Sequence, residues 1–122
     1  MHCNSKHIYQ RITADLLTIG IPLQVLGFLY LREAVKLCAE DTSLRMGNFF
    51  KKVYASVAQK MDTSVSKVER NIRHAIGAGW ETATANKLNS LIGTQVFSPT
   101  LKPTNSMLII LLADKIYLDS MV

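Results

Sequence analysis

The chain has 122 residues, of which 48% are hydrophobic, with only three prolines and six glycines. This length and composition are typical of one globular domain and exclude a disordered chain. The longest apolar run, residues 107–113, is far shorter than the roughly 18 residues that cross a bilayer, and the N-terminus has no apolar signal segment. We therefore expect a soluble cytoplasmic protein with no membrane partner.

The net charge is +5 at pH 7, from 14 Lys and Arg against nine Asp and Glu. Residues 45–75 hold seven basic and two acidic side chains, whereas the rest of the chain holds seven of each. A local positive excess favours an anionic partner such as nucleic acid, although charged stretches are also common on ordinary solvated surfaces. The position of these residues on the predicted helices is therefore important.

Apolar residues recur every three or four positions along most of the chain, as in amphipathic helices, and no segment alternates convincingly with period two. We predict an all-α fold, a compact bundle of about six helices containing a helix-turn-helix. It forms one domain over residues 8–122, after a disordered or frayed segment at residues 1–7. The helices are expected at about residues 8–19, 27–40, 50–61, 63–78, 85–92 and 104–119.

The fourth predicted helix has two distinct faces. Thr63 or Ser64 can cap its first turn. At about 100° per residue, apolar residues fall on one arc and polar or charged residues on the opposite arc. The first arc should face the core and the second should face outward. The apolar arc holds Val65, Val68, Ile72, Ala75 and Ile76, and the polar arc holds Ser66, Lys67, Glu69, Arg70, Arg73 and His74.

The third and fourth predicted helices are separated by a turn of three or four residues, as in a helix-turn-helix. The second helix of that motif enters the major groove, where Arg can bond guanine with both arms, Glu can accept from cytosine and Lys can bond guanine or phosphate. The predicted base-reading residues are Glu69, Arg70, Arg73, Lys67 and Ser66. Weaker candidates, for phosphate contacts, are Lys51, Lys52, Lys60, Thr63, Ser64 and His74.

A simpler interpretation of the same helix is available. Glu69 and Arg73 are four residues apart and could be an ordinary surface ion pair, with Lys67 and Arg70 solvated beside them. The last predicted helix also allows two interpretations, because it is apolar nearly all round. Such a helix is usually buried in its own domain, which we expect here, but part of its surface could equally meet a second subunit.

Metal and catalytic chemistry have little support in the sequence. His2, Cys3 and His7 are loosely grouped near the N-terminus, and Cys3 and Cys38 lack the spacing of a zinc site or a disulfide framework. We expect reduced thiols, no metal and no cofactor. His74 has no nucleophile at suitable spacing, so we do not expect an enzyme.

Residues 67–76, with the sequence KVERNIRHAI, closely resemble the recognition helix of the stage 0 sporulation protein A effector-domain family. Further similar segments at residues 27–34, 102–106 and 113–115 extend the resemblance over about residues 12–118. It implies a six-helix domain that binds a short promoter box in double-stranded DNA as a homodimer or as tandem subunits, and activates or represses transcription. The final helix is a candidate subunit contact, and RNA polymerase is a further candidate partner.

The chain departs from the family at several points, among them Ala55, Ser56 and Gln59 in the preceding helix and Gly77 and Gly79 at the end of the recognition helix. Lys67 stands where the family usually has Arg, which keeps the charge but loses the two-armed bond, so this residue could contact phosphate or change the base preference. The family also carries an N-terminal receiver domain with a phosphorylated aspartate, which the residues before Ile8 cannot form. An excised effector domain or a stand-alone relative would look like this, and we favour the second.

The sequence thus predicts a sequence-specific transcription regulator of the bacterial cytosol, at the nucleoid when bound to DNA. The alternative is a protein interaction module that does not bind DNA, or an antagonist, built on the same fold.

Overall fold

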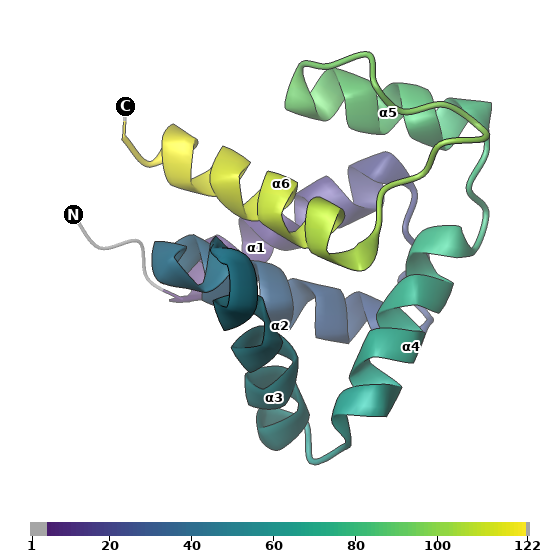
Figure 1. The fold of residues 1–122 in the computed structure, drawn as a ribbon. Helices are drawn as coiled ribbons and strands as arrows, with labels where there is room; N and C mark the ends of the chain where they lie inside the picture. Colours follow the sequence, from purple (N-terminus) through teal and green to yellow (C-terminus); the bar gives the residue numbers. More distant parts are fainter. Residues whose placement is uncertain (1–4, 122) are drawn as a thin grey trace.

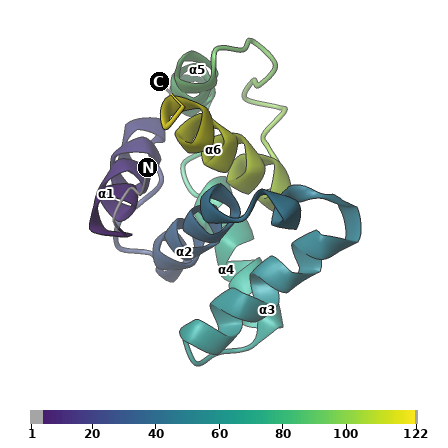
Figure 2. The same cartoon turned by 90° about the vertical axis from the view of Figure 1, so that its left-hand side faces the viewer.

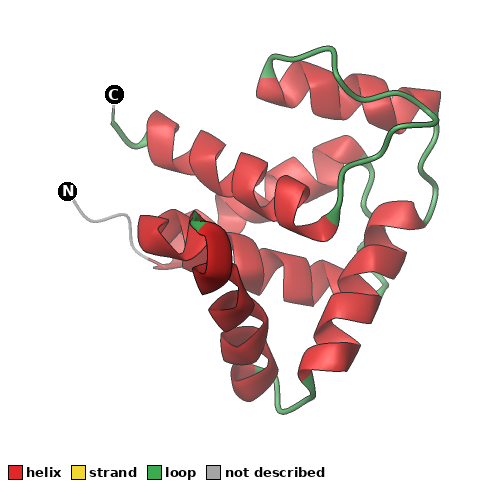
Figure 3. Cartoon of the chain, viewed as in Figure 1, coloured by secondary structure: helices red, strands yellow, loops and turns green. Residues whose placement is uncertain are grey.

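The computed structural model describes residues 5–121, which form helices joined by turns and loops (Figure 3). Within this range six α-helices and two short 3-10 helices occur, and the only β-type pairing is an isolated bridge between Ser98 and Leu101. The predicted all-α fold is therefore confirmed. The elements are α1 (Ser5–Ile19), α2 (Leu26–Glu40), η1 (Thr42–Arg45), η2 (Gly47–Phe50), α3 (Lys51–Lys60), α4 (Val65–Gly77), α5 (Thr82–Ile92) and α6 (Asn105–Asp119).

Helix α2 is the centre of the fold and contacts α1, α3, α4 and α6. In Figures 1 and 2, α3 and α4 extend from one end of the molecule and meet at their connecting turn, while α5 lies at the opposite end. One cluster of buried side chains draws on all six helices, with Phe28, Leu31 and Val35 of α2 fully buried within it. Helix α4 therefore packs on the core through its contact with α2.

The predicted helix boundaries agree closely with the observed ones where a specific residue ends or begins a helix. Thr104 Oγ1 accepts a hydrogen bond from the Met107 N–H and caps α6, and Gly93, with φ 82°, ends α5 in the left-handed region. Helix α1 begins at Ser5, so residues 5–7 belong to it rather than to the expected frayed segment. Residues 1–4 lie outside the described part.

The short helices η1 and η2 were not predicted. They occupy residues 42–50, where Leu44 is the one buried residue of η1, so no helical apolar stripe develops. Asp41 starts η1 because its carboxylate accepts hydrogen bonds from the backbone N–H of Ser43, at 3.1 Å, and from its hydroxyl, at 2.6 Å.

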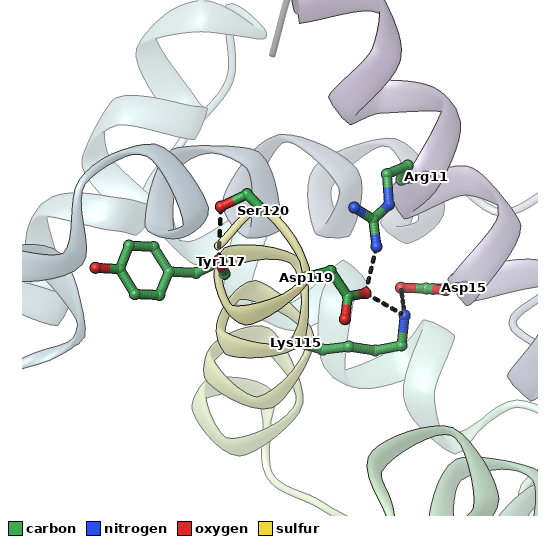
Figure 4. A network of polar contacts seen from close by, with 6 residues as sticks. All are labelled: Arg11, Asp15, Lys115, Tyr117, Asp119 and Ser120. Carbon is green, nitrogen blue, oxygen red and sulfur yellow. Dashed lines mark hydrogen bonds and ion pairs between the residues drawn. The ribbon is translucent and has the colours of Figure 1, made fainter. Parts of the chain in front are cut away.

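A polar network joins the end of α6 to α1 (Figure 4). Lys115 Nζ lies 3.5 Å from Asp15 Oδ2 and 3.3 Å from Asp119 Oδ2, and Arg11 also donates to Asp119. Burial raises the pKa of Asp15, against the opposing effect of Lys115. Burial also acts to raise the pKa of Asp119, but hydrogen bonds from Arg11 and Lys115 outweigh it and the pKa falls. Folding therefore raises the pKa of Asp15 and lowers that of Asp119.

Helix α6 is buried on one face only. Its exposed apolar residues, which we call the α6 stripe, are Met107 near the start of the helix and Tyr117 and Leu118 near its end, at 43%, 39% and 52% exposure. The expected burial therefore holds for half of the helix. Despite this apolar character, none of the helices within residues 5–121 has the length and continuous hydropathy that crossing a bilayer requires. The buried face holds Leu108, Ile109, Leu112, Ala113 and Ile116.

Candidate nucleic-acid interface

Helix α3 ends in a tight reversal that leads directly into α4. The N–H of Thr63 donates to the Ala58 carbonyl at 2.9 Å, and the N–H of Asp62 donates to the Gln59 carbonyl at 3.4 Å. This pair of bonds requires a left-handed residue between the helix and the next turn, and Asp62 adopts φ 53°. Ser64 then starts α4, since its Oγ accepts from the Lys67 N–H at 3.2 Å. Of the two predicted caps, Ser64 is the one used.

The buried face of α4 fixes its rotation about the helix axis. Val68, Ile72 and Ala75 are fully buried, and Ile76 nearly so, against the core. Val65, which we expected on the apolar arc, is 44% exposed at the first residue of the helix. The helix runs over Val65–Gly77, slightly shorter than the predicted 63–78.

The opposite face of α4 is fully presented to solvent. At about 100° per residue, Arg70 lies at the centre of this face, with Lys67 and His74 on one flank and Glu69 and Arg73 on the other. All of these side chains, and Ser66 at the first turn, are exposed. Within residues 5–121 neither Lys67 nor Arg70 forms an ion pair. We call this surface the α4 face.

Glu69 and Arg73 do form an ion pair, with 3.4 Å between Glu69 Oε1 and an Arg73 guanidinium nitrogen. Their side chains are 48% and 61% exposed, so the pair contributes at most some tenths of a kcal/mol to stability. The pairing anticipated by the simpler interpretation of the helix is thus present. It also holds the Glu69 carboxylate beside the guanidinium, so the two side chains form one donor and acceptor unit.

The start of α6 lies against this flank of α4, which the sequence did not predict. Asn105 Nδ2 donates to the Glu69 carbonyl at 2.9 Å, and a cavity of about 380 Å³ is lined by Tyr54, Arg73, Lys102 and Asn105, among others. Lys102 therefore adds a positive charge beside Arg73 although it lies outside the basic region of the sequence. The one signal that could have found it is the family resemblance of residues 102–106.

The predicted phosphate contacts occupy different parts of the surface. Thr63 and Ser64 lie in the turn at the start of α4, next to the α4 face. Lys51 and Lys52 are exposed at the first residues of α3, which is the end of that helix farther from the turn. The length of α3 therefore separates Lys51 and Lys52 from Thr63 and Ser64.

Lys60 is engaged elsewhere. Its Nζ donates to Glu33 Oε1 at 2.7 Å and to the Tyr9 hydroxyl at 2.8 Å. These two hydrogen bonds raise the pKa of Lys60 well above its ordinary value. Because its charge is already satisfied by groups on α1 and α2, Lys60 is the weakest of the phosphate candidates.

No group of three or more His, Cys, Asp or Glu side chains within residues 5–121 is arranged to hold a metal ion. His2 and Cys3 of the loose N-terminal group lie outside the described residues. Cys38 is a buried free thiol, and burial raises its pKa to about 11 although Arg45 acts in the opposite direction. A thiol of this kind is unreactive at neutral pH.

Comparison with known protein families matches residues 12–116 to the family described as "Sporulation initiation factor Spo0A C terminal". The match begins in α1, ends in α6 and includes all of α4. It confirms the resemblance seen in the sequence. The family consists of DNA-binding effector domains that regulate transcription. Because the match covers most of the chain, this protein belongs to the Spo0A C-terminal family of sporulation initiation factors.

Proposed function

We propose that this protein is a sequence-specific transcription regulator that places α4 in the major groove of double-stranded DNA, with α3, the turn and α4 acting as a helix-turn-helix. The observation that carries the proposal is the α4 face. It offers Arg70 at its centre and Lys67 beside it, both exposed and without an ion-pair partner among residues 5–121. The buried side of the helix fixes the direction in which they point.

Each residue of the α4 face has a role suited to its chemistry. Arg70 is positioned to bond O6 and N7 of a guanine with both arms of its guanidinium. Arg73 does the same one turn later, oriented by Glu69, whose remaining acceptor capacity suits the amino group of cytosine. Lys67 bonds guanine or phosphate, and Ser66 contacts the base edge nearest the start of the helix.

Phosphate contacts surround this face. Ser64 uses an oxygen lone pair to cap α4, so its O–H stays available to donate to a phosphate at the helix N-terminus, where the helix dipole also favours an anion. Thr63 precedes Ser64 in the turn, and His74 is exposed in the last turn of α4. Lys51 and Lys52 hold the backbone from α3, and Lys60 contributes least.

The α6 stripe is the surface through which we propose that subunits meet as a homodimer or in tandem on the promoter box. Met107, Tyr117 and Leu118 are the exposed apolar residues available for that contact. Contact with RNA polymerase would then follow from DNA-bound subunits, in the bacterial cytoplasm at the nucleoid. A chain that occupies the box without contacting polymerase would act as an antagonist instead.

The proposal is tested by fluorescence anisotropy with a labelled duplex that carries the promoter box of this family and a scrambled duplex of equal composition. Binding to the box should be tighter, and on both duplexes log K should fall linearly with log salt concentration, by about 0.9 for each phosphate neutralised. Equal affinity for both duplexes would remove sequence specificity. A folded protein that binds neither duplex at low salt would be an interaction module.

Arg70→Ala tests the central residue of the α4 face. It should weaken binding to the box by about 1–3 kcal/mol and change binding to the scrambled duplex much less. Lys87→Ala is the matched control, because it removes one exposed positive charge from α5, at the far end of the molecule. If both variants weaken binding to both duplexes equally, Arg70 supplies only positive charge and does not read a base.

A further inference from the structure

A second concave surface lies on the side of the molecule formed by α1, α2 and the end of α3. It has a volume of about 960 Å³, and no residue of α4 lines it. We call it the Tyr9 groove after the aromatic residue on its wall. Residues that line it include Lys6, Tyr9, Thr13, Leu17, Arg32 and Lys60.

Positive charge is concentrated around Tyr9. The guanidinium carbon of Arg32 lies 5.5 Å from the ring centroid, and the Nζ atoms of Lys36 and Lys60 lie 5.3 and 5.5 Å from it. Arg32 and Lys36 are close enough for attraction by the ring, whereas Lys60 approaches through the hydroxyl, to which it donates at 2.8 Å. Lys36 is neutralised by Glu40 at 2.7 Å, outside the groove.

The groove itself is left with an uncompensated positive charge. Its cations are Lys6, Arg32 and Lys60, and its one carboxylate is that of Glu33. Glu33 already accepts from Lys60 Nζ and from the Tyr9 hydroxyl, each at 2.7 Å. Both bonds go to Oε1, and Glu33 forms no ion pair with Arg32.

Arg32 is the least satisfied charged group in this region. One guanidinium nitrogen donates to Thr13 Oγ1 at 3.3 Å, whereas the buried Nε has no hydrogen-bond partner. No carboxylate within residues 5–121 pairs with this guanidinium. A carboxylate brought by a ligand would pair with the guanidinium charge, which no carboxylate of the described residues neutralises.

The same groove has an apolar end. Leu17, one helical turn beyond Thr13 on α1, is 48% exposed, and Ala14 beside it is also exposed. A small inorganic anion would use the cations and leave this apolar surface uncovered. A ligand that covers both the cations and the apolar surface must carry acidic and apolar groups about one helical turn apart.

We propose that the Tyr9 groove binds a short acidic, amphipathic segment of a partner protein. Its carboxylates lie opposite Arg32 and Lys6, and an apolar side chain packs on Leu17. Charge complementarity attracts the segment and fixes its position along the groove, and the buried apolar contact supplies affinity. Because the groove and the α4 face share no residue, the segment can bind whether or not α4 holds DNA.

The test uses a display library of random dodecapeptides selected on the full chain. Clones retained by the native protein and lost on Leu17→Gln should be enriched in Asp and Glu that flank Leu, Ile or Phe. Leu23→Gln is the matched control, since Leu23 is an exposed leucine, at 56%, that does not line the groove. A library that yields no acidic enrichment, or clones insensitive to Leu17→Gln, would overturn the proposal.

One enriched peptide is then titrated by anisotropy against the native chain and its variants. Leu17→Gln and Arg32→Gln should each weaken it about tenfold or more, and Leu23→Gln should leave it unchanged. Circular dichroism of Arg32→Gln checks that the fold is retained, and Leu17→Gln gives the result independently if it is not. The proposal would also be contradicted if the peptide bound equally well after its acidic residues were changed to Lys. Full competition by millimolar inorganic phosphate would contradict it too.

Discussion

Gly27 of α2 lies so close to the backbone of α4 that no side chain fits between them. A Cβ atom at this position would lie 2.1 Å from the Asn71 carbonyl oxygen and 2.7 Å from the Ala75 Cβ. Carbon atoms at rest are about 3.5–4.0 Å apart, so both contacts are severe. Because the carbonyl belongs to the backbone of α4, it cannot turn aside as a flexible side chain could. This close approach sets the depth at which α4 sits in the fold.

Gly27→Ala should therefore destabilise the protein by about 3 kcal/mol, at the upper end of the range for overpacked cores. Urea unfolding measures the change. Gly77→Ala is the control, because a Cβ there meets only the mobile end of Lys102, at 3.3 Å, and Ala is favoured over Gly in a helix by about 1 kcal/mol. Similar changes in both variants would rule out close helix packing as the cause.

Asp62 adopts a left-handed conformation in the turn between α3 and α4, with φ 53°. An L-residue in this region loses about 1–2 kcal/mol relative to the right-handed conformation, although Asp tolerates it better than most. Asp62→Gly should raise the free energy of unfolding by up to about 1 kcal/mol, and Asp62→Ala should lower it. Thermal unfolding checks both variants, and Asp62→Asn separates the loss of charge from the backbone effect.

The network at the end of α6 gives a prediction about pH. Burial raises the pKa of Asp15 in the folded protein, so folding favours its protonated form. The stability that Asp15 contributes is therefore highest in acid and falls as the pH rises through its folded pKa. Asp15→Asn, which resembles the protonated form, should be more stable than the native chain at pH 7 and equal to it near pH 3, as measured by urea unfolding across that range.

Asp119 should behave in the opposite way. Its pKa is lowered because the hydrogen bonds from Arg11 and Lys115 outweigh burial, so its contribution is present above the ordinary pKa of an Asp and is lost as the pH falls. Asp119→Asn should be less stable than the native chain at pH 7, and this difference should vanish in acid. If both Asn variants shift stability in the same direction at pH 7, the network does not distinguish the two carboxyls.

The helices could be predicted from the sequence because their signals are local. Ser64 and Thr104 cap α4 and α6 through bonds to residues three positions ahead, and Gly93 ends α5 by its own backbone conformation. The two faces of α4 follow from its period alone. Nothing beyond a few neighbouring residues is needed to predict any of these features.

The surroundings of α4 depend on contacts between residues far apart in the chain, and these were missed. Asn105 reaches the Glu69 carbonyl across 36 positions, and Lys60 is held by Glu33 across 27. Charge composition counted Lys60 with the α4 residues, whereas folding turns it toward α1 and α2. The sequence therefore predicted the two faces of α4 better than the residues that surround this helix.

The family resemblance predicts Arg at the position of Lys67 on the α4 face, and replacing Lys67 with Arg tests what this difference does. Its side chain is exposed and forms no ion pair within the described residues, so Arg fits there without disturbing the fold. Arg would restore the planar pair of donors that matches O6 and N7 of guanine.

If Lys67 faces a guanine of the box, Lys67→Arg should tighten binding to the box by about 1 kcal/mol or more and leave the scrambled duplex nearly unchanged. Anisotropy titrations of both duplexes at one salt concentration measure the ratio, with Lys87→Arg as the control for an added guanidinium elsewhere. Equal tightening on both duplexes would assign Lys67 to the phosphate backbone, because phosphate contacts carry no sequence information. Weaker binding to the box alone would mean that this protein prefers a different base at that position, one that Lys reads and Arg does not.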